Sequence, residues 1–318
     1  MVIAAARESR VALAQLLVAE LLIGSVGVFV HEGKQDPITS VFFRCVFGSV
    51  FLIMWGSARG YLQGAFRDRT LVKASIVSGI LLVLNWVALF AGMARSSIGV
   101  ATIVYHFFPF AMLILAAVFL RERTHPADVA WTVFAFIGVG LSADPFKLFS
   151  AASASYLLGI ALTFVAAILC GASLLLSRRI SRERPFVVVL IQCLTGVAML
   201  APFADYAAVA HVGSHWTWLA GIGVIHSGVC YVLFYSAYPR LPVKTIAVMA
   251  FIYPVVTLAL DFLLYGRTLQ PVQIAGIALI VVGTLGVNLK WRWSGYFSGT
   301  APRVATIGNP REVRGSSE

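Results

Sequence analysis

Long apolar runs recur along this chain from Val11 to Leu289, and the charged residues are confined to the joints between the runs. A bilayer core about 30 Å thick takes about 20 helical residues per crossing, so such a chain can cross a membrane many times. Composition agrees, because 60% of the residues are hydrophobic and 12% are charged, whereas a soluble domain is about half apolar and about a quarter charged. The sequence predicts an all-α polytopic membrane protein and excludes an ordinary soluble enzyme.

The apolar runs predict ten transmembrane helices. The first run is too long for the core of a signal peptide and lacks a small-residue cleavage site, so we expect it to stay in the protein as a helix. The expected spans, bounded by helix breakers and charges, are 11–30, 38–56, 71–93, 97–120, 128–143, 156–177, 186–203, 216–238, 245–264 and 271–289.

The distribution of Lys and Arg predicts the orientation, because basic loops resist translocation. With the N-terminus inside, only Lys34, Arg95, Lys147 and Arg267 of the 24 Lys and Arg residues fall outside, and Arg44 falls within a span. We therefore expect a multi-pass protein of the inner (plasma) membrane with both termini in the cytoplasm. The basic joints also explain the net charge of +11, so no nucleic-acid partner is indicated.

The positions of proline and glycine residues, and of one arginine, repeat along the chain. Shifts of 145 and 148 residues superpose Arg95 on Arg240, Pro109 on Pro254, Pro126 on Pro271, Gly138 on Gly283, Pro37 on Pro185 and Gly48 on Gly196. Five spans per repeat is an odd number, so the halves take opposite orientations, the inverted-repeat plan of many secondary transporters. Helix-packing habit alone is the alternative explanation of the shared Pro and Gly. The expected segments are a cytoplasmic N-terminus at 1–10, a first five-helix repeat at 11–145, a second at 150–289, and a basic, disordered cytoplasmic tail at 290–318.

A family resemblance rests on the expected fourth span, where Ile103-Val-Tyr-His-Phe-Phe-Pro109 is followed by Leu120-Arg-Glu-Arg-Thr. Together with the five-plus-five plan, this resembles the EamA-type ten-helix transporters of the drug/metabolite transporter superfamily, over about residues 11–289. In that family the fourth span usually ends in Gly-Glu. Here Glu122 keeps the acid and Arg121 replaces the Gly, while the second half has Gly266-Arg267 without the acid. The resemblance implies export of amino acids or related metabolites.

Three ionisable residues lie inside expected spans: Glu20, Arg44 and Asp261. Each needs a compensating role, because a charge in the bilayer centre costs about 2.5 to 3.5 kcal/mol on insertion scales. The Ala19-Glu-Leu-Leu-Ile-Gly24 stretch resembles the first helix of the small multidrug resistance branch of the same superfamily, with the Gly displaced by one residue. That resemblance implies a glutamate that exchanges protons for substrate.

Glu20 also has a purely structural interpretation. Its expected depth differs from that of Arg44 by about 6 Å at 1.5 Å per residue, so an ion pair between the two is within reach. Pairing, proton coupling and substrate contact therefore all stay open for Glu20. For Asp261, a surface ion pair with Arg267 is the favoured interpretation.

Aromatic and polar residues of the third, fourth and eighth spans are the other candidates for substrate or proton binding. Many apolar helices carry aromatic residues for packing alone, but Trp86 and Tyr231 are related by the 145-residue shift. Tyr105 and His106 stand one turn before Pro109, where a proline frees backbone carbonyls for a ligand. The full set of candidates is Glu20, Arg44, Asn85, Trp86, Tyr105, His106, Tyr231 and Tyr235, with Pro109 and Pro254 as helix breaks.

Cofactors and metals are not expected. The four cysteines, Cys45, Cys170, Cys193 and Cys230, lie in apolar runs without C-x-x-C spacing, which is typical of packing residues. His211 and His215 have helical metal spacing but lie in an outer loop without a third ligand. No phosphate-binding G-x-x-x-x-G-K-[ST] motif is present, so we expect energy from an ion gradient or from the substrate's own gradient.

The sequence thus favours a secondary transporter that exports small amphipathic metabolites, such as amino acids or aromatic or cationic compounds, by alternating access with proton exchange. A passive facilitator of the same substrates is the alternative, and a membrane-embedded lipid-modifying enzyme a minor one; the chain itself is not expected to be an enzyme. The expected partners are the small-molecule substrate, the proton and the lipid bilayer. Two inverted halves can work as a monomer or a weak homodimer.

Overall fold

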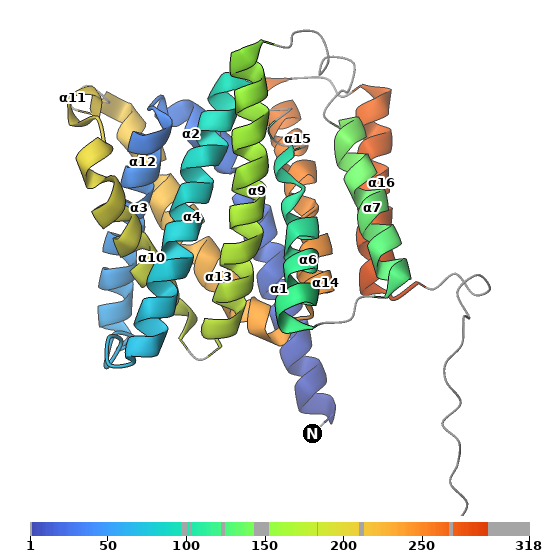
Figure 1. Cartoon of the computed structure of the whole chain (residues 1–318), viewed down its shortest axis with the longest axis horizontal. Coiled ribbons are helices and arrows are strands. Elements are labelled where there is room, and N and C mark those ends of the chain that lie inside the picture. The colour runs from blue at the N-terminus through green and yellow to red at the C-terminus, as the bar shows by residue number, and fades with distance from the viewer. Residues whose placement is uncertain are drawn as a thin grey trace, which may run out of the picture.

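The structure, a computed structural model, is helical throughout the part of the chain that it describes: residues 2–96, 101, 104–121, 125–142, 153–182, 184–209, 213–266 and 270–291 (Figure 1). The tail beyond Trp291, the acid Glu122, His211 and Arg267 lie outside these residues, as does the side chain of Asp261. The expectations for them stay predictions.

Every expected span overlaps an apolar helical segment, but not all of these segments are long enough to cross a membrane. Seven are long and apolar enough to cross a membrane, namely Glu8–Gly33, Pro37–Ala58, Arg69–Arg95, Ala154–Ile180, Pro185–Phe203, Gly213–Arg240 and Val243–Leu264. The fourth, fifth and tenth expected spans correspond to the shorter apolar helices Phe108–Leu120, Pro126–Leu141 and Pro271–Val287. The N-terminus of α1 and the C-terminus of α16 lie at the same end of the bundle (Figure 1).

The repeated prolines mark where helices begin. Proline opens α3 (Pro37–Ala58), α7 (Pro126–Ser142), α10 (Pro185–Leu200) and α16 (Pro271–Asn288), a position that needs no N–H donor and suits the fixed φ of proline. Asp36 caps α3 by accepting hydrogen bonds from the backbone N–H groups of Ile38 and Thr39. Asp68 caps α4 (Arg69–Arg95) in the same way. The repeated prolines are therefore explained locally, by the geometry of the first helical turn.

Several expected spans are not continuous α-helices. The first divides at Gly24 into α1 (Val2–Ile23) and α2 (Val26–Gly33). The eighth comprises η2 (Gly213–His215), α12 (Trp216–Gly221), a π-helical segment η3 (Ile222–Val229), α13 (Cys230–Ala237) and η4 (Tyr238–Arg240), and the ninth divides into α14 (Val243–Met249) and α15 (Ile252–Tyr265). The remaining elements are α6 (Phe108–Leu120), α9 (Ala154–Ile180), η1 (Ala201–Phe203) and α11 (Tyr206–Val209).

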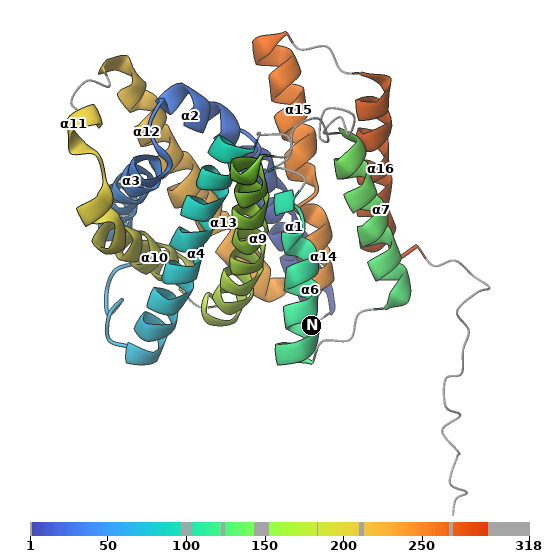
Figure 2. The ribbon, with the colours of Figure 1, turned by 45° about the horizontal axis from the view of Figure 1, so that its top comes forward.

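Helices related by the repeat pack against one another. α7 and α16 lie side by side on one flank of the bundle, and α3 packs on α10 at the other (Figure 2). A Cβ added at Gly138 would lie 2.6 Å from the Gly276 carbonyl oxygen, and one at Gly283 would lie 2.8 Å from the Trp131 carbonyl oxygen. These contacts exchange under the 145-residue shift, as in the self-complementary interface of a twofold dimer. The repeated glycines lie where the backbones of the two helices approach each other closely.

The α3–α10 contact has the same reciprocity under the 148-residue shift. A Cβ at Gly48 would lie 3.3 Å from the Cys193 sulfur, and a Cβ at Gly196 would collide with the Cys45 sulfur. Cys45 and Cys193 are themselves related by this shift. These buried cysteines are therefore packing residues at an approximate twofold axis.

Candidate functional site: a charged aromatic cavity

A cavity lies where the two halves meet. The volume open to water in it is about 80 Å³. Its walls come from both repeats, while α7 and α16 contribute none of the described lining residues. Those residues are Glu20, Ile23, Val26, Arg44, Trp86, Leu89, Phe90, Tyr105, His106, Phe108, Cys170, Leu174, Tyr231, Phe234, Tyr238, Ala250 and Tyr253.

Trp86 of α4 and Tyr231 of α13 meet at this cavity. The indole Nε1–H donates a hydrogen bond of 3.2 Å to the Tyr231 hydroxyl, and the rings meet edge to face with centroids 5.4 Å apart. The two residues are related by the 145-residue shift, so their contact lies on the approximate twofold axis. The structure thus brings together two candidates that the sequence linked only by their spacing.

Arg44 of α3 is buried, with 2% of its surface exposed, and reaches the same cavity. Its guanidinium carbon lies 3.9 Å from the centroid of the Trp86 ring, and its Nε–H donates a hydrogen bond of 2.7 Å to the Ser227 hydroxyl. Stacking on an indole and a hydrogen bond to a fixed hydroxyl together orient the planar group.

Glu20 of α1 lines the cavity too, and only 4% of its surface is exposed. The ion pair considered between Glu20 and Arg44 is not formed: within the described chain, no Lys, Arg or His nitrogen lies within 4.0 Å of the Glu20 carboxylate. The depth argument for that pair was wrong because depth along two helices does not fix which faces meet. The cavity therefore carries one acidic and one basic group that do not neutralise each other by contact.

The helix breaks at the repeated prolines border the cavity. Helical geometry is interrupted at His106–Phe107, shortly before Pro109, and at Ala250–Phe251, shortly before Pro254. Because proline has no N–H, it cannot bond the carbonyl four residues earlier, which is Tyr105 in one half. In the other half it is Ala250. Both residues line the cavity.

His106 is fully buried among rings from the second half. Its imidazole lies 5.2 Å from the Tyr253 ring centroid and 6.2 Å from that of Phe251. Phe251 is the residue that corresponds to His106 under the 145-residue shift. The two breaks therefore face each other.

Two candidates do not reach the cavity. Asn85 and Tyr235 are both fully buried, but neither lines it. Tyr235 packs on the Tyr231 ring, with centroids 5.6 Å apart, and so supports the wall from behind.

The two described histidines of the second half, His215 and His226, have structural partners. His226 of the π-helical segment shares a hydrogen bond of 3.0 Å with the Ser25 hydroxyl at the break between α1 and α2. The Nδ1–H of His215 donates to the Glu32 carbonyl at 2.7 Å. Among the described residues, no group of three or more His, Cys, Asp or Glu side chains could hold a metal ion.

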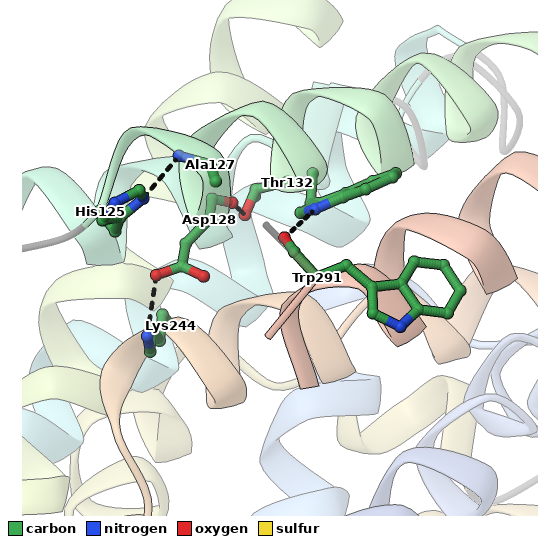
Figure 3. Close-up of polar contacts among 7 residues, drawn as sticks. His125, Ala127, Asp128, Thr132, Lys244 and Trp291 are labelled. Carbon is green, nitrogen blue, oxygen red and sulfur yellow. Dashed lines mark hydrogen bonds and ion pairs between the residues drawn. The ribbon is translucent and has the colours of Figure 1, made fainter. Parts of the chain in front are cut away.

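Sequence reasoning missed two features. Tyr253 lines the cavity as the repeat mate of Phe108, so the 145-residue shift could have identified it. The second is an ion pair of 2.8 Å between Lys244 Nζ and Asp128, whose side chain is 1% exposed, at the start of α7 (Figure 3). Nearby, the Trp131 indole N–H donates to the Trp291 carbonyl at 3.1 Å (Figure 3). These contacts tie α7 to α14 and to the end of α16.

Comparison with known proteins agrees with this architecture. A transporter of Bacillus subtilis (strain 168), YxxF, is 27% identical over 281 residues, which cover 87% of this chain and 89% of YxxF. The pseudopaline exporter CntI of Pseudomonas aeruginosa is 26% identical over 253 residues, covering 78% of this chain and 84% of CntI. A protein of known crystal structure shares the fold with a TM-score of 0.76 at 21% identity, over 88% of this chain and 96% of that chain.

The sequence pattern of the EamA-like transporter family matches the chain twice, at residues 10–143 and at 157–289. The two matches correspond to the two halves that pack on each other at their repeated glycines and at the Trp86–Tyr231 contact. With its membrane-length apolar helices, the chain is a multi-pass membrane protein of transporter rather than enzyme type. It belongs to the EamA-like transporter family.

Proposed function

We propose that this protein is a secondary active transporter that exports small amphipathic metabolites across the inner membrane in exchange for protons. The chain crosses the membrane ten times as two inverted five-helix repeats, with both termini in the cytoplasm. The shared end of α1 and α16 supports this topology, as does the distribution of Lys and Arg. That CntI is named an exporter supports the direction of transport.

The observation that carries the proposal is the Glu20 carboxylate. It is buried in a membrane-length helix, lines the cavity between the halves and has no ion-pair partner in the described chain. A carboxylate in that setting either binds a proton or a cationic group of a ligand. If the two events exclude each other, protons moving inward drive substrate outward.

The breaks at Pro109 and Pro254 supply the moving parts. Each lies beside an interruption of helical geometry, at His106–Phe107 and at Ala250–Phe251, and residues at both interruptions line the cavity. Half-helices that pivot at these points can open the cavity to one side and close it to the other, while α7 and α16 hold the flank. Alternating access then needs little movement of the α7–α16 pair.

The test is transport by the purified protein in proteoliposomes. Inside-out vesicles with an acidic lumen are supplied with radiolabelled amino acids and aromatic cations, and accumulation is compared for the native chain and Glu20→Gln. We expect the acidic lumen to accelerate accumulation by the native chain and the variant to lose this acceleration. Glu8→Gln is the matched control, because Glu8 lies on the same helix but is exposed. Flux that ignores both the pH gradient and Glu20→Gln contradicts proton exchange and favours the passive facilitator.

A further inference from the structure

Arg44 presents an unusual imbalance of charge. Its guanidinium is buried in a membrane-length helix, yet within the described chain no carboxylate lies within 4.0 Å of it. Its Nη2 group is buried without a hydrogen-bond partner. A buried cation needs an opposite charge and filled hydrogen bonds, which the Trp86 ring and the Ser227 hydroxyl do not complete.

The unfilled side of Arg44 belongs to a site that can take a ligand. The Trp86 ring covers one face of the guanidinium at 3.9 Å, and Ser227 holds its Nε. The two Nη groups form the fork that suits a carboxylate with two parallel hydrogen bonds. Arg44 is one of the residues that line the cavity, so a ligand in the cavity would lie next to this side chain.

We propose that Arg44 is the residue that recognises an anionic group of the substrate, and that this group is a carboxylate. This inference rests on the proposed function, because it assumes that the ligand is a transported substrate. It narrows the class of substrates to molecules that carry a carboxylate. A compound that is only cationic would meet an unpaired guanidinium of its own sign, so simple aromatic cations are rejected. Glu20 stays available for a proton or for an amine elsewhere on the same molecule, and the aromatic wall takes the apolar body.

The first test compares matched compounds that differ only in charge. The probes are phenylacetate with phenylacetamide and phenethylamine, and L-phenylalanine and L-leucine with their amides. Unfolding of the purified protein is followed with a thiol-reactive dye, since all four native cysteines are buried. We expect carboxylates to raise the unfolding temperature and the amides and the amine to leave it unchanged. Equal stabilisation by amides or amines overturns the proposal, and so does the absence of stabilisation by any carboxylate.

The second test uses variants. Arg44→Gln is expected to weaken carboxylate binding by about 30-fold or more, as when one partner of a buried charge pair is removed. Arg44→Lys keeps the charge but not the planar fork, and should recover binding only in part. Arg59→Gln is the matched control, because Arg59 also stacks on an indole, with its guanidinium carbon 5.0 Å from the Trp55 ring centroid, but is exposed. Unchanged binding in a folded Arg44→Gln protein overturns the proposal.

A second hollow is rich in arginine, so it needs its own control. A hollow of about 760 Å³ at the joint that precedes α4 is lined by Arg67, Arg179, Arg182 and Arg184. Carboxylate stabilisation that disappears in Arg184→Gln and persists in Arg44→Gln assigns the anion to this hollow and overturns the role of Arg44.

The two proposals fail separately. Proton-driven export of an amide or a cation leaves transport standing and refutes anion recognition by Arg44. Carboxylate binding that depends on Arg44, without any proton-driven flux, supports anion recognition and refutes proton-driven export. If Arg44→Gln does not fold, the matched compounds on the native chain and the Arg44→Lys variant still decide the question.

Discussion

Gly138 and Gly140 lie two residues apart on α7 and should respond to alanine in opposite directions. A Cβ at Gly138 would lie 2.6 Å from the Gly276 carbonyl oxygen and 2.9 Å from the Ile280 nitrogen, and both are backbone atoms that cannot rotate away. A Cβ at Gly140 has nothing within 4 Å. The pair isolates helix approach from helix propensity within one element.

The magnitudes follow from these distances. Alanine gains up to about 1 kcal/mol over glycine in a helix, at either position. At Gly138 the helices must separate by about 0.8 Å to move the closest contact from 2.6 Å to the 3.4 Å at which ordinary contact begins. Such overpacking costs about 1–3 kcal/mol. We expect Gly138→Ala to lose about 1 kcal/mol net and Gly140→Ala to gain up to about 1 kcal/mol.

The assay is unfolding in detergent, followed by the reaction of a maleimide dye with the four buried thiols as they become exposed. Transport per folded molecule should stay unchanged in both variants, because none of the described residues of α7 or α16 lines the cavity. Equal stability of the two variants would refute the argument that Gly138 marks a contact between helix backbones. Loss of transport by folded Gly138→Ala protein would instead show that this pair of helices moves during the cycle.

Three further predictions concern two contacts and the orientation of the chain. Trp86→Phe removes the hydrogen bond to the Tyr231 hydroxyl and should lower the free energy of unfolding by about 1 kcal/mol; no change in unfolding contradicts this. Lys244→Met should destabilise more than Asp128→Asn, by about 1 kcal/mol or more, because the Asp128 side chain is 1% exposed and that of Lys244 is 25% exposed; the reverse order, measured by the same unfolding assay, would refute it. Lys34→Cys should react with a membrane-impermeant maleimide from outside intact spheroplasts, and labelling only after permeabilisation would invert the orientation.

Local sequence features predict much of the fold. Apolar runs give the helices, and the prolines at helix starts and breaks act on their own turn of backbone, so Pro37, Pro109 and Pro254 could be interpreted without a structure. The repeat shift also predicted a special relation of Trp86 to Tyr231. Its physical content, a hydrogen-bonded contact, needed the packing of two halves.

The candidate site was less accessible to sequence reasoning. Glu20 and Arg44 were singled out because charge is rare in apolar helices, and both do line the cavity. The ion pair between them, one of the alternatives left open, is not formed, and the sequence could not decide this because the answer depends on the rotation of each helix about its axis. The Asp128–Lys244 pair joins residues 116 apart in the sequence, and nothing in the local pattern connects them.

The approximate twofold axis has a consequence for how a ligand can lie in the cavity. Under the 148-residue shift Arg44 corresponds to Gln192, a buried neutral amide that donates to the hydroxyls of Ser78 and Ser177. Two identical halves would have to carry the same side chain at both places and would accept a polar molecule in two equivalent directions. Joining the halves in one chain lets a single position become charged. The cavity thereby acquires a polarity, and if Arg44 binds a carboxylate as proposed, a bound molecule takes one head-to-tail direction.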